Sequence, residues 1–153
     1  MIYVDKSELM CYTNSVVNTE QRFICVSRPR RFGKSMAANM LTAYYSRGCD
    51  SRELFSSYKI AKSDYFENHL NKYNVIHINM VQYLDEAKNV EDMLKYIEED
   101  IIGDITDEFP DLKMPRRVTL TNVLDKAFSQ FGIPFVFVID EWDCVFRKNK
   151  IAT

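Results

Sequence analysis

The sequence predicts an α/β fold in which helices flank a parallel β-sheet. Short, β-favouring apolar runs alternate along the chain with longer segments of helical periodicity. One run, residues 135–139, is apolar at every position, which is typical of a strand buried on both faces of a covered parallel sheet. The 153 residues are 46% hydrophobic and contain only four glycines and four prolines, so we expect one continuous domain without a flexible linker.

The first predicted unit is a strand, a loop and a helix. The segment 22–26 is a short apolar run that favours a β-strand, and residues 27–33 have the composition of a turn. A helical pattern then runs from Lys34 to about Tyr45, with Gly48 as its candidate C-terminal cap. The apolar face of this helix carries Met36, Met40, Leu41 and Tyr44.

The later elements repeat this alternation. Residues 75–80 form a second candidate strand, and residues 89–109 have the apolar spacing of a long amphipathic helix. A further helix is predicted over residues 119–131, where Gly132 and Pro134 act as stop signals. The apolar run at 135–139 follows as the last strand.

Composition and charge exclude several classes of protein. A net charge of −2 argues against a generally basic nucleic-acid-binding surface and gives no support to binding at a membrane. The sequence contains neither a membrane-spanning apolar stretch nor the apolar block of a signal peptide, so we expect a cytoplasmic protein. The four cysteines are far apart and predict neither a zinc site nor a redox motif; they are Cys11, Cys25, Cys49 and Cys144.

The first chemical motif is Gly33-Lys34-Ser35, which stands after a predicted strand and loop and at the start of a predicted helix. It matches the end of the phosphate-binding loop G-x-x-x-x-G-K-[ST]. In such a loop the glycine lets backbone N–H groups approach phosphates, the lysine reaches the β and γ oxygens, and the serine offers a hydroxyl to Mg²⁺. Arg28 stands where the pattern has its first glycine, and the tripeptide alone also occurs on ordinary protein surfaces.

The second motif is Asp140-Glu141, at the C-terminal end of the apolar run. Ligands of open α/β sheets bind at this edge. There Asp140 is placed to hold Mg²⁺, and Glu141 to orient and deprotonate the water that attacks a γ-phosphate. Taken alone, the motif equally describes a strand that ends in solvated acids. The order of the two motifs in the chain favours nucleotide chemistry.

These two motifs carry a family resemblance. The segments Tyr-Val-Asp-Lys-Ser at 3–7, Ser-Arg-Pro-Arg-Arg-Phe-Gly-Lys-Ser at 27–35 and Ile-Asp-Glu-Trp-Asp at 139–143 resemble the predicted AAA-ATPase-like family of bacterial P-loop proteins. In that family arginine or a similar residue replaces the first loop glycine, so Arg28 agrees with the resemblance. The resemblance implies a three-layer P-loop NTPase-like parallel sheet, of which this chain is the N-terminal portion.

The resemblance also implies a function and a site. It implies a domain that binds ATP and Mg²⁺ and has weak ATP hydrolysis, with Glu141 and Lys34 as the catalytic residues and Ser35 and Asp140 as the Mg²⁺ ligands. The implied nucleotide-binding residues are Arg28, Pro29, Arg30, Arg31, Phe32, Gly33, Lys34, Ser35 and Met36.

Relatives with this resemblance continue well past the acidic strand end, whereas thirteen residues follow Asp140 here. We therefore expect residues 1–153 to form a single truncated domain that lacks the sensor and arginine-finger elements. The strand expected between the two motif-bearing strands would be absent. Because exposed strand edges invite pairing, a homo-oligomer or a protein partner is expected to cover the open edge.

An alternative function comes from the charge distribution. Residues 85–111 contain eleven acids against two lysines. The simpler interpretation is the solvated face of an amphipathic helix. The other is an acidic surface that binds a macromolecular partner, which would make the chain a non-catalytic binding module or a small inhibitor, for example one encoded on a mobile element. Replacing Lys34, or reversing the helix charges, would separate the two functions.

Overall fold

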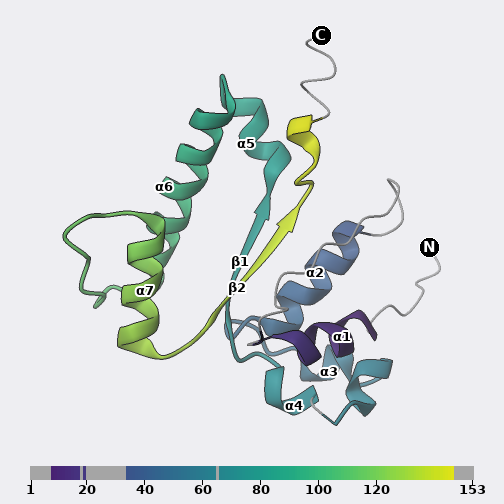
Figure 1. Ribbon diagram of the computed structural model, residues 1–153. Coiled ribbons are helices and arrows are strands. Elements are labelled where there is room, and N and C mark those ends of the chain that lie inside the picture. Colours follow the sequence, from purple (N-terminus) through teal and green to yellow (C-terminus); the bar gives the residue numbers. More distant parts are fainter. Residues whose placement is uncertain (1–7, 18, 20–33, 65, 147–153) are drawn as a thin grey trace. The chain divides into compact units, whose positions relative to one another are not determined.

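The computed structural model describes residues 8–17, 19, 34–64 and 66–146. The chain divides into two compact units, Met1–Val75 and Ile76–Thr153. Figure 1 shows the elements, which are in chain order α1 (Glu8–Val16), α2 (Lys34–Tyr45), α3 (Arg52–Phe55), the 3₁₀ helix η1 (Lys59–Lys62), α4 (Phe66–His69), β1 (Asn74–Asn79), α5 (Met80–Glu86), α6 (Val90–Glu108), α7 (Leu120–Phe131) and β2 (Phe135–Asp140).

Five predicted elements lie among the described residues and agree closely with the structure, whereas α1, α3, η1, α4 and α5 were not predicted. Helix α2 has the predicted bounds, and β1, α6 and α7 each agree to within one residue at either end. The fold is a mixed α/β structure with a helical majority, and its two described strands pair in parallel. The strand predicted at 22–26 and the loop predicted at 27–33 lie outside the described residues. Among the described helices, none has the length and apolar character needed to cross a membrane.

In the first unit, α1 and α2 are joined by a buried polar network. Tyr44 and Tyr45, at the end of α2, are 0% and 2% exposed. The hydroxyl of Tyr45 donates to Oδ1 of Asn14 at 2.7 Å, and Nδ2 of Asn14 donates to the hydroxyl of Tyr44 at 2.9 Å. Burial raises the pKa of Tyr44 to about 12, so its hydroxyl stays protonated at neutral pH. The network fixes α1 against the C-terminal turn of α2.

Asn71 holds the C-terminal end of α2. Its Nδ2 donates to the carbonyl oxygens of Ala43 at 3.0 Å and Ser46 at 2.8 Å, and its Oδ1 accepts the N–H of Ser51 at 3.1 Å. Its φ of 54° lies in the left-handed region, which asparagine tolerates better than most residues. The last carbonyls of a helix have no partner within the helix, so this one side chain satisfies groups that would otherwise be unpaired.

Asn71→Ala is therefore expected to lower the free energy of unfolding by about 2–4 kcal/mol, because the four hydrogen bonds of the side chain are lost and alanine is strained at this φ. Asn71→Gly is the matched variant, since it loses the same bonds but accepts the backbone conformation. It should be destabilised less than Asn71→Ala. Thermal unfolding followed by the near-ultraviolet circular dichroism of the tyrosines would measure both, and an alanine variant as stable as the wild type would contradict the role of Asn71.

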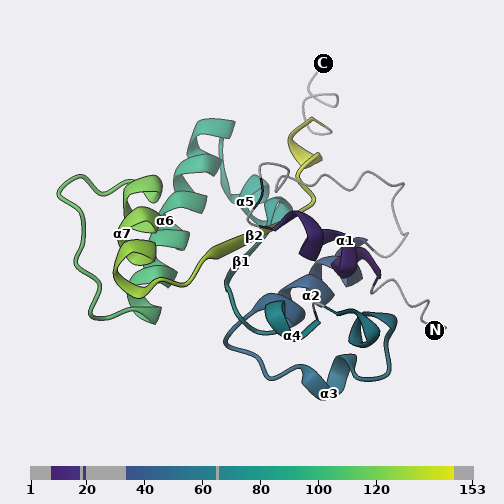
Figure 2. The ribbon, with the colours of Figure 1, turned by 60° about the horizontal axis from the view of Figure 1, so that its bottom comes forward.

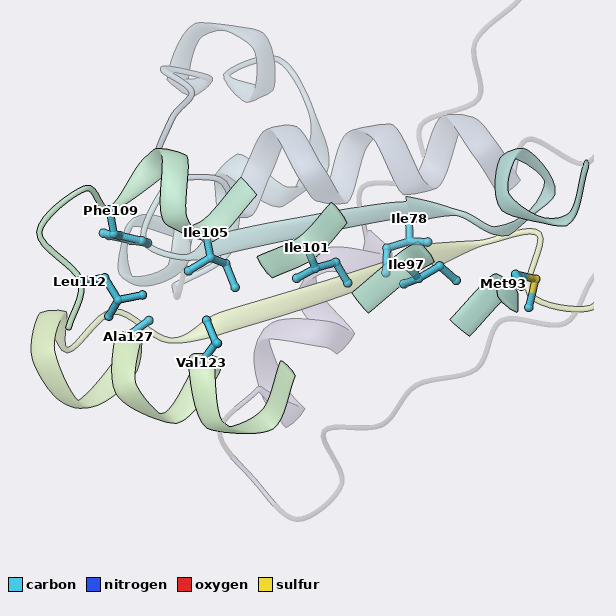
Figure 3. Packing of buried hydrophobic residues seen from close by; sticks show 9 residues of the cluster. All are labelled: Ile78, Met93, Ile97, Ile101, Ile105, Phe109, Leu112, Val123 and Ala127. Carbon is cyan, nitrogen blue, oxygen red and sulfur yellow. The ribbon is translucent and has the colours of Figure 1, made fainter. Parts of the chain in front are cut away.

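In the second unit, α6 and α7 pack together against the sheet. Figure 3 shows the shared core, to which α6 contributes a stripe of one residue per turn, α7 contributes two residues and β1 contributes one. Phe109 and Phe131 stack with their ring centroids 4.5 Å apart and close one end of this core. The core residues are Ile78, Met93, Ile97, Ile101, Ile105, Phe109, Leu112, Val123 and Ala127.

The helix ends in this unit follow local sequence rules. The side chain of Asn89 accepts the N–H of Asp92 at 2.8 Å, and Oγ1 of Thr119 accepts the N–H of Asn122 at 3.2 Å. Both are N-caps of the kind that asparagine and threonine commonly make. Gly132 ends α7 in a left-handed conformation with φ 73°, as predicted from its place after the apolar stripe.

The prediction that the last strand is buried on both faces is wrong. Phe137 and Ile139 alternate on one face of β2 and are 39% and 49% exposed, whereas Val138 on the opposite face is 9% exposed. The physical reason is that, within the second unit, no described segment covers the side of β2 that carries Phe137 and Ile139. Cover of this strand by another chain stays a prediction.

Candidate nucleotide-binding site

The basic half of the candidate site is the start of α2. In the described structure this helix runs from Lys34 through Ser35 and Met36, so it contains the last two residues of the Gly33-Lys34-Ser35 motif. The predicted loop residues Arg28, Pro29, Arg30, Arg31, Phe32 and Gly33 lie outside the described residues, as do the side chains of Lys34 and Ser35. Met36 has a 37% exposed side chain.

The sequence of α2 explains why a helix forms directly after the motif. Ala37, Ala38 and Ala43 are strong helix formers, and the helix contains neither glycine nor proline. Its first turn carries no acidic residue. The N–H groups of that turn have no partner within the helix, and the helix dipole favours negative charge there. The start of α2 is therefore suited to an anion such as a phosphate.

The acidic half of the candidate site is the end of β2. Asp140 is the last residue of this strand and is half-buried. Its Oδ1 accepts the backbone N–H of Glu141 at 2.9 Å. Glu141 has a φ of 58°, in the left-handed region, where a non-glycine residue costs about 1–3 kcal/mol. This sharp turn at Glu141 ends the strand directly after Asp140.

The segment after Glu141 folds back on the second unit. The N–H of Cys144 donates to the carbonyl of Glu141 at 3.1 Å, and Cys144 is 4% exposed. Val145 packs against the core of that unit. Trp142 and Phe146 form an edge-to-face pair with ring centroids 6.3 Å apart and are both exposed. These contacts tie the position of Glu141 to the core.

The four predicted chemical residues thus form two pairs. Lys34 and Ser35 open α2 in the first unit, and Asp140 and Glu141 are neighbours at the end of β2 in the second. Sequence reasoning did not identify Asn71, which holds the far end of α2 and so positions the helix that carries Lys34. An asparagine in a short polar stretch before a strand was the available signal, because asparagine tolerates left-handed turns.

A helix that contains the Lys-Ser of a Gly-Lys-Ser motif and a strand that ends at the Asp of an Asp-Glu pair are typical of P-loop nucleotide-binding proteins. The chain belongs to the predicted AAA-ATPase family, whose model matches residues 1–151. Neither the comparison with curated proteins nor the comparison with solved structures gave a match. Family membership implies nucleotide binding in general terms.

Proposed function

We propose that this protein binds ATP with Mg²⁺ through its phosphate-binding loop and hydrolyses it slowly. The observation that supports this most strongly is that α2 begins at Lys34, because the motif then stands where helix N–H groups and a lysine can meet the same phosphate. Lys34 would contact the β and γ phosphates and Ser35 would offer its hydroxyl to Mg²⁺. The residues from Arg28 to Gly33 would cradle the phosphates, with Met36 following them.

The acidic strand end would supply the metal and water chemistry. Asp140 stands at the carboxyl end of β2, the edge at which open α/β sheets bind ligands. Mg²⁺ keeps several waters and needs few protein ligands when phosphates are present, so one carboxylate and one hydroxyl are sufficient. Glu141 would orient and deprotonate the attacking water. Residues 1–153 would act as one P-loop domain.

Isosteric variants can distinguish the proposed roles of the Asp140 and Glu141 carboxylates. Glu141→Gln should keep Mg-ATP binding but lower turnover by about 10²-fold or more, because it removes the general base and keeps the shape. Asp140→Asn should instead weaken the Mg²⁺ dependence of binding, because a carboxylate ligand is lost. Calorimetry with ATP, with and without Mg²⁺, and single-turnover hydrolysis would measure these effects.

The matched control for these variants is Asp125→Asn, which removes an exposed carboxylate from α7. It should change neither binding nor turnover. A folded wild-type chain that does not bind Mg-ATP would overturn the proposed function. Wild-type turnover in the Glu141→Gln variant would remove Glu141 from the mechanism and leave binding intact.

A further inference from the structure

The connection between α6 and α7, which Figure 2 shows as a wide loop beside the two helices, is attached to α7 near its start and near its end. Near its start, Nε2 of Gln130 donates to the carbonyl of Asp111 at 2.9 Å, and Oε1 of Gln130 accepts the N–H of Lys113 at 3.1 Å. Near its end, Nδ2 of Asn122 donates to the carbonyl of Arg117 at 2.9 Å. Two amide side chains of one helix therefore fix the backbone of this loop.

This fixed loop presents cations beside apolar side chains. Met114 and Val118 are 38% and 51% exposed, although buried apolar neighbours lie close by in the chain. Lys113, Arg116 and Arg117 are exposed, and none of them forms an ion pair within the part of the chain that the structure describes. The five residues Lys113, Met114, Arg116, Arg117 and Val118 are called the basic loop surface.

The N-terminal half of α6 presents the complementary combination. Val90 and Leu94, one turn apart, are 41% and 56% exposed. Glu91 and Glu98 stand beside them on the same side of the helix, three and four residues from Leu94. Neither carboxylate forms an ion pair with a described residue. The four residues Val90, Glu91, Leu94 and Glu98 are called the acidic helix surface.

Two other acids of α6 already have partners within the unit. Glu99 pairs with Lys95 at 3.9 Å, and Asp100 accepts the hydroxyl of Tyr83 at 2.8 Å. The Asp100 carboxylate also leaves the Tyr83 hydroxyl protonated, because burial and this contact raise the pKa of Tyr83 to about 12. The acids beside Leu94 are thus distinguished by their exposed apolar neighbours.

We propose that the acidic helix surface of one chain binds the basic loop surface of a second copy. The charges are opposite, and two exposed apolar side chains on each surface would be removed from water together. Both surfaces belong to the unit Ile76–Thr153. Because the two surfaces differ, the contact is heterologous and leaves one free surface at each end of a pair. It does not depend on nucleotide.

The test uses two charge-reversal variants of the full chain without nucleotide. Arg116→Glu with Arg117→Glu makes both surfaces acidic, and Glu91→Arg with Glu98→Arg makes both basic. Each variant alone should self-associate at least about tenfold more weakly than the wild type, because like charges then face each other. An equimolar mixture should recover association, since opposite surfaces meet again. Sedimentation velocity over a concentration series measures all of these.

Recovery in the mixture separates a contact from a folding defect, because two misfolded chains would not restore each other. Lys62→Glu with Lys72→Glu reverses two exposed charges elsewhere and should associate as the wild type does. Wild-type association should also weaken as salt is raised. A wild type that is monomeric throughout, or a mixture that does not recover, would overturn the proposal. Failure to bind ATP would not affect it.

Discussion

Lys34→Ala is expected to weaken Mg-ATP binding by about 10- to 100-fold and to leave the protein folded. A hydrogen bond to a charged group contributes about 1.5–3 kcal/mol, and each 1.4 kcal/mol corresponds to about tenfold in affinity. The fold should be kept, because alanine is a strong helix former. In addition, α2 is anchored by the buried Tyr44 and Tyr45 at its C-terminal end, at the opposite end of the helix from Lys34. Calorimetric titration of both chains with Mg-ATP measures the loss.

The matched control is Lys62→Ala, which removes an exposed lysine from η1 in the same unit. It should bind Mg-ATP as the wild type does, so a general effect of lost positive charge would be recognised. Equal affinity in the Lys34→Ala variant and the wild type would show that nucleotide binds without this lysine. The phosphate-loop interpretation of Gly33-Lys34-Ser35 would then be wrong, while family membership would stand.

The largest expected effect on stability is in the core of the second unit. Ile101 is 4% exposed on α6 and belongs to the cluster that joins α6, α7 and β1 (Figure 3). Ile101→Ala should lower the free energy of unfolding by about 2–5 kcal/mol, through lost apolar burial and the cavity left behind. Ile101→Val should cost only about 0.5–1.5 kcal/mol. The graded series distinguishes a packing effect from a disturbance of the helix.

Denaturant unfolding followed by tryptophan fluorescence suits this measurement, because Trp142 is the one tryptophan of the chain and lies in the same unit as Ile101. Phe128→Ala is the control: it removes a larger apolar side chain, but one that is 52% exposed on α7. Its effect should be clearly smaller than that of Ile101→Ala. The reverse order of the two effects would contradict the assignment of this core.

Local sequence signals predicted the longest helices, α2, α6 and α7, and both described strands, but not the shorter helices. The stripe Met93, Ile97, Ile101 and Ile105 follows the helical period, and the structure buries all four. Gly132 ends α7 with a positive φ, which glycine adopts at little cost. These features depend on residues a few positions apart, so the sequence alone contains the information that determines them. The two motifs and the family resemblance also came from short segments, and the family is confirmed over residues 1–151.

Exposure and long-range contacts were decided by tertiary structure. The apolar run of β2 predicted two buried faces, yet Phe137 and Ile139 are exposed. The hydrophobicity of a strand does not determine whether another segment packs against each of its faces. Likewise, Asn71 bonds to carbonyls 25 and 28 residues earlier, which no periodicity reveals. The sequence by itself determined the elements, the motifs and the family. Only the packing of distant segments determined which faces are buried, since burial depends on every segment that comes near.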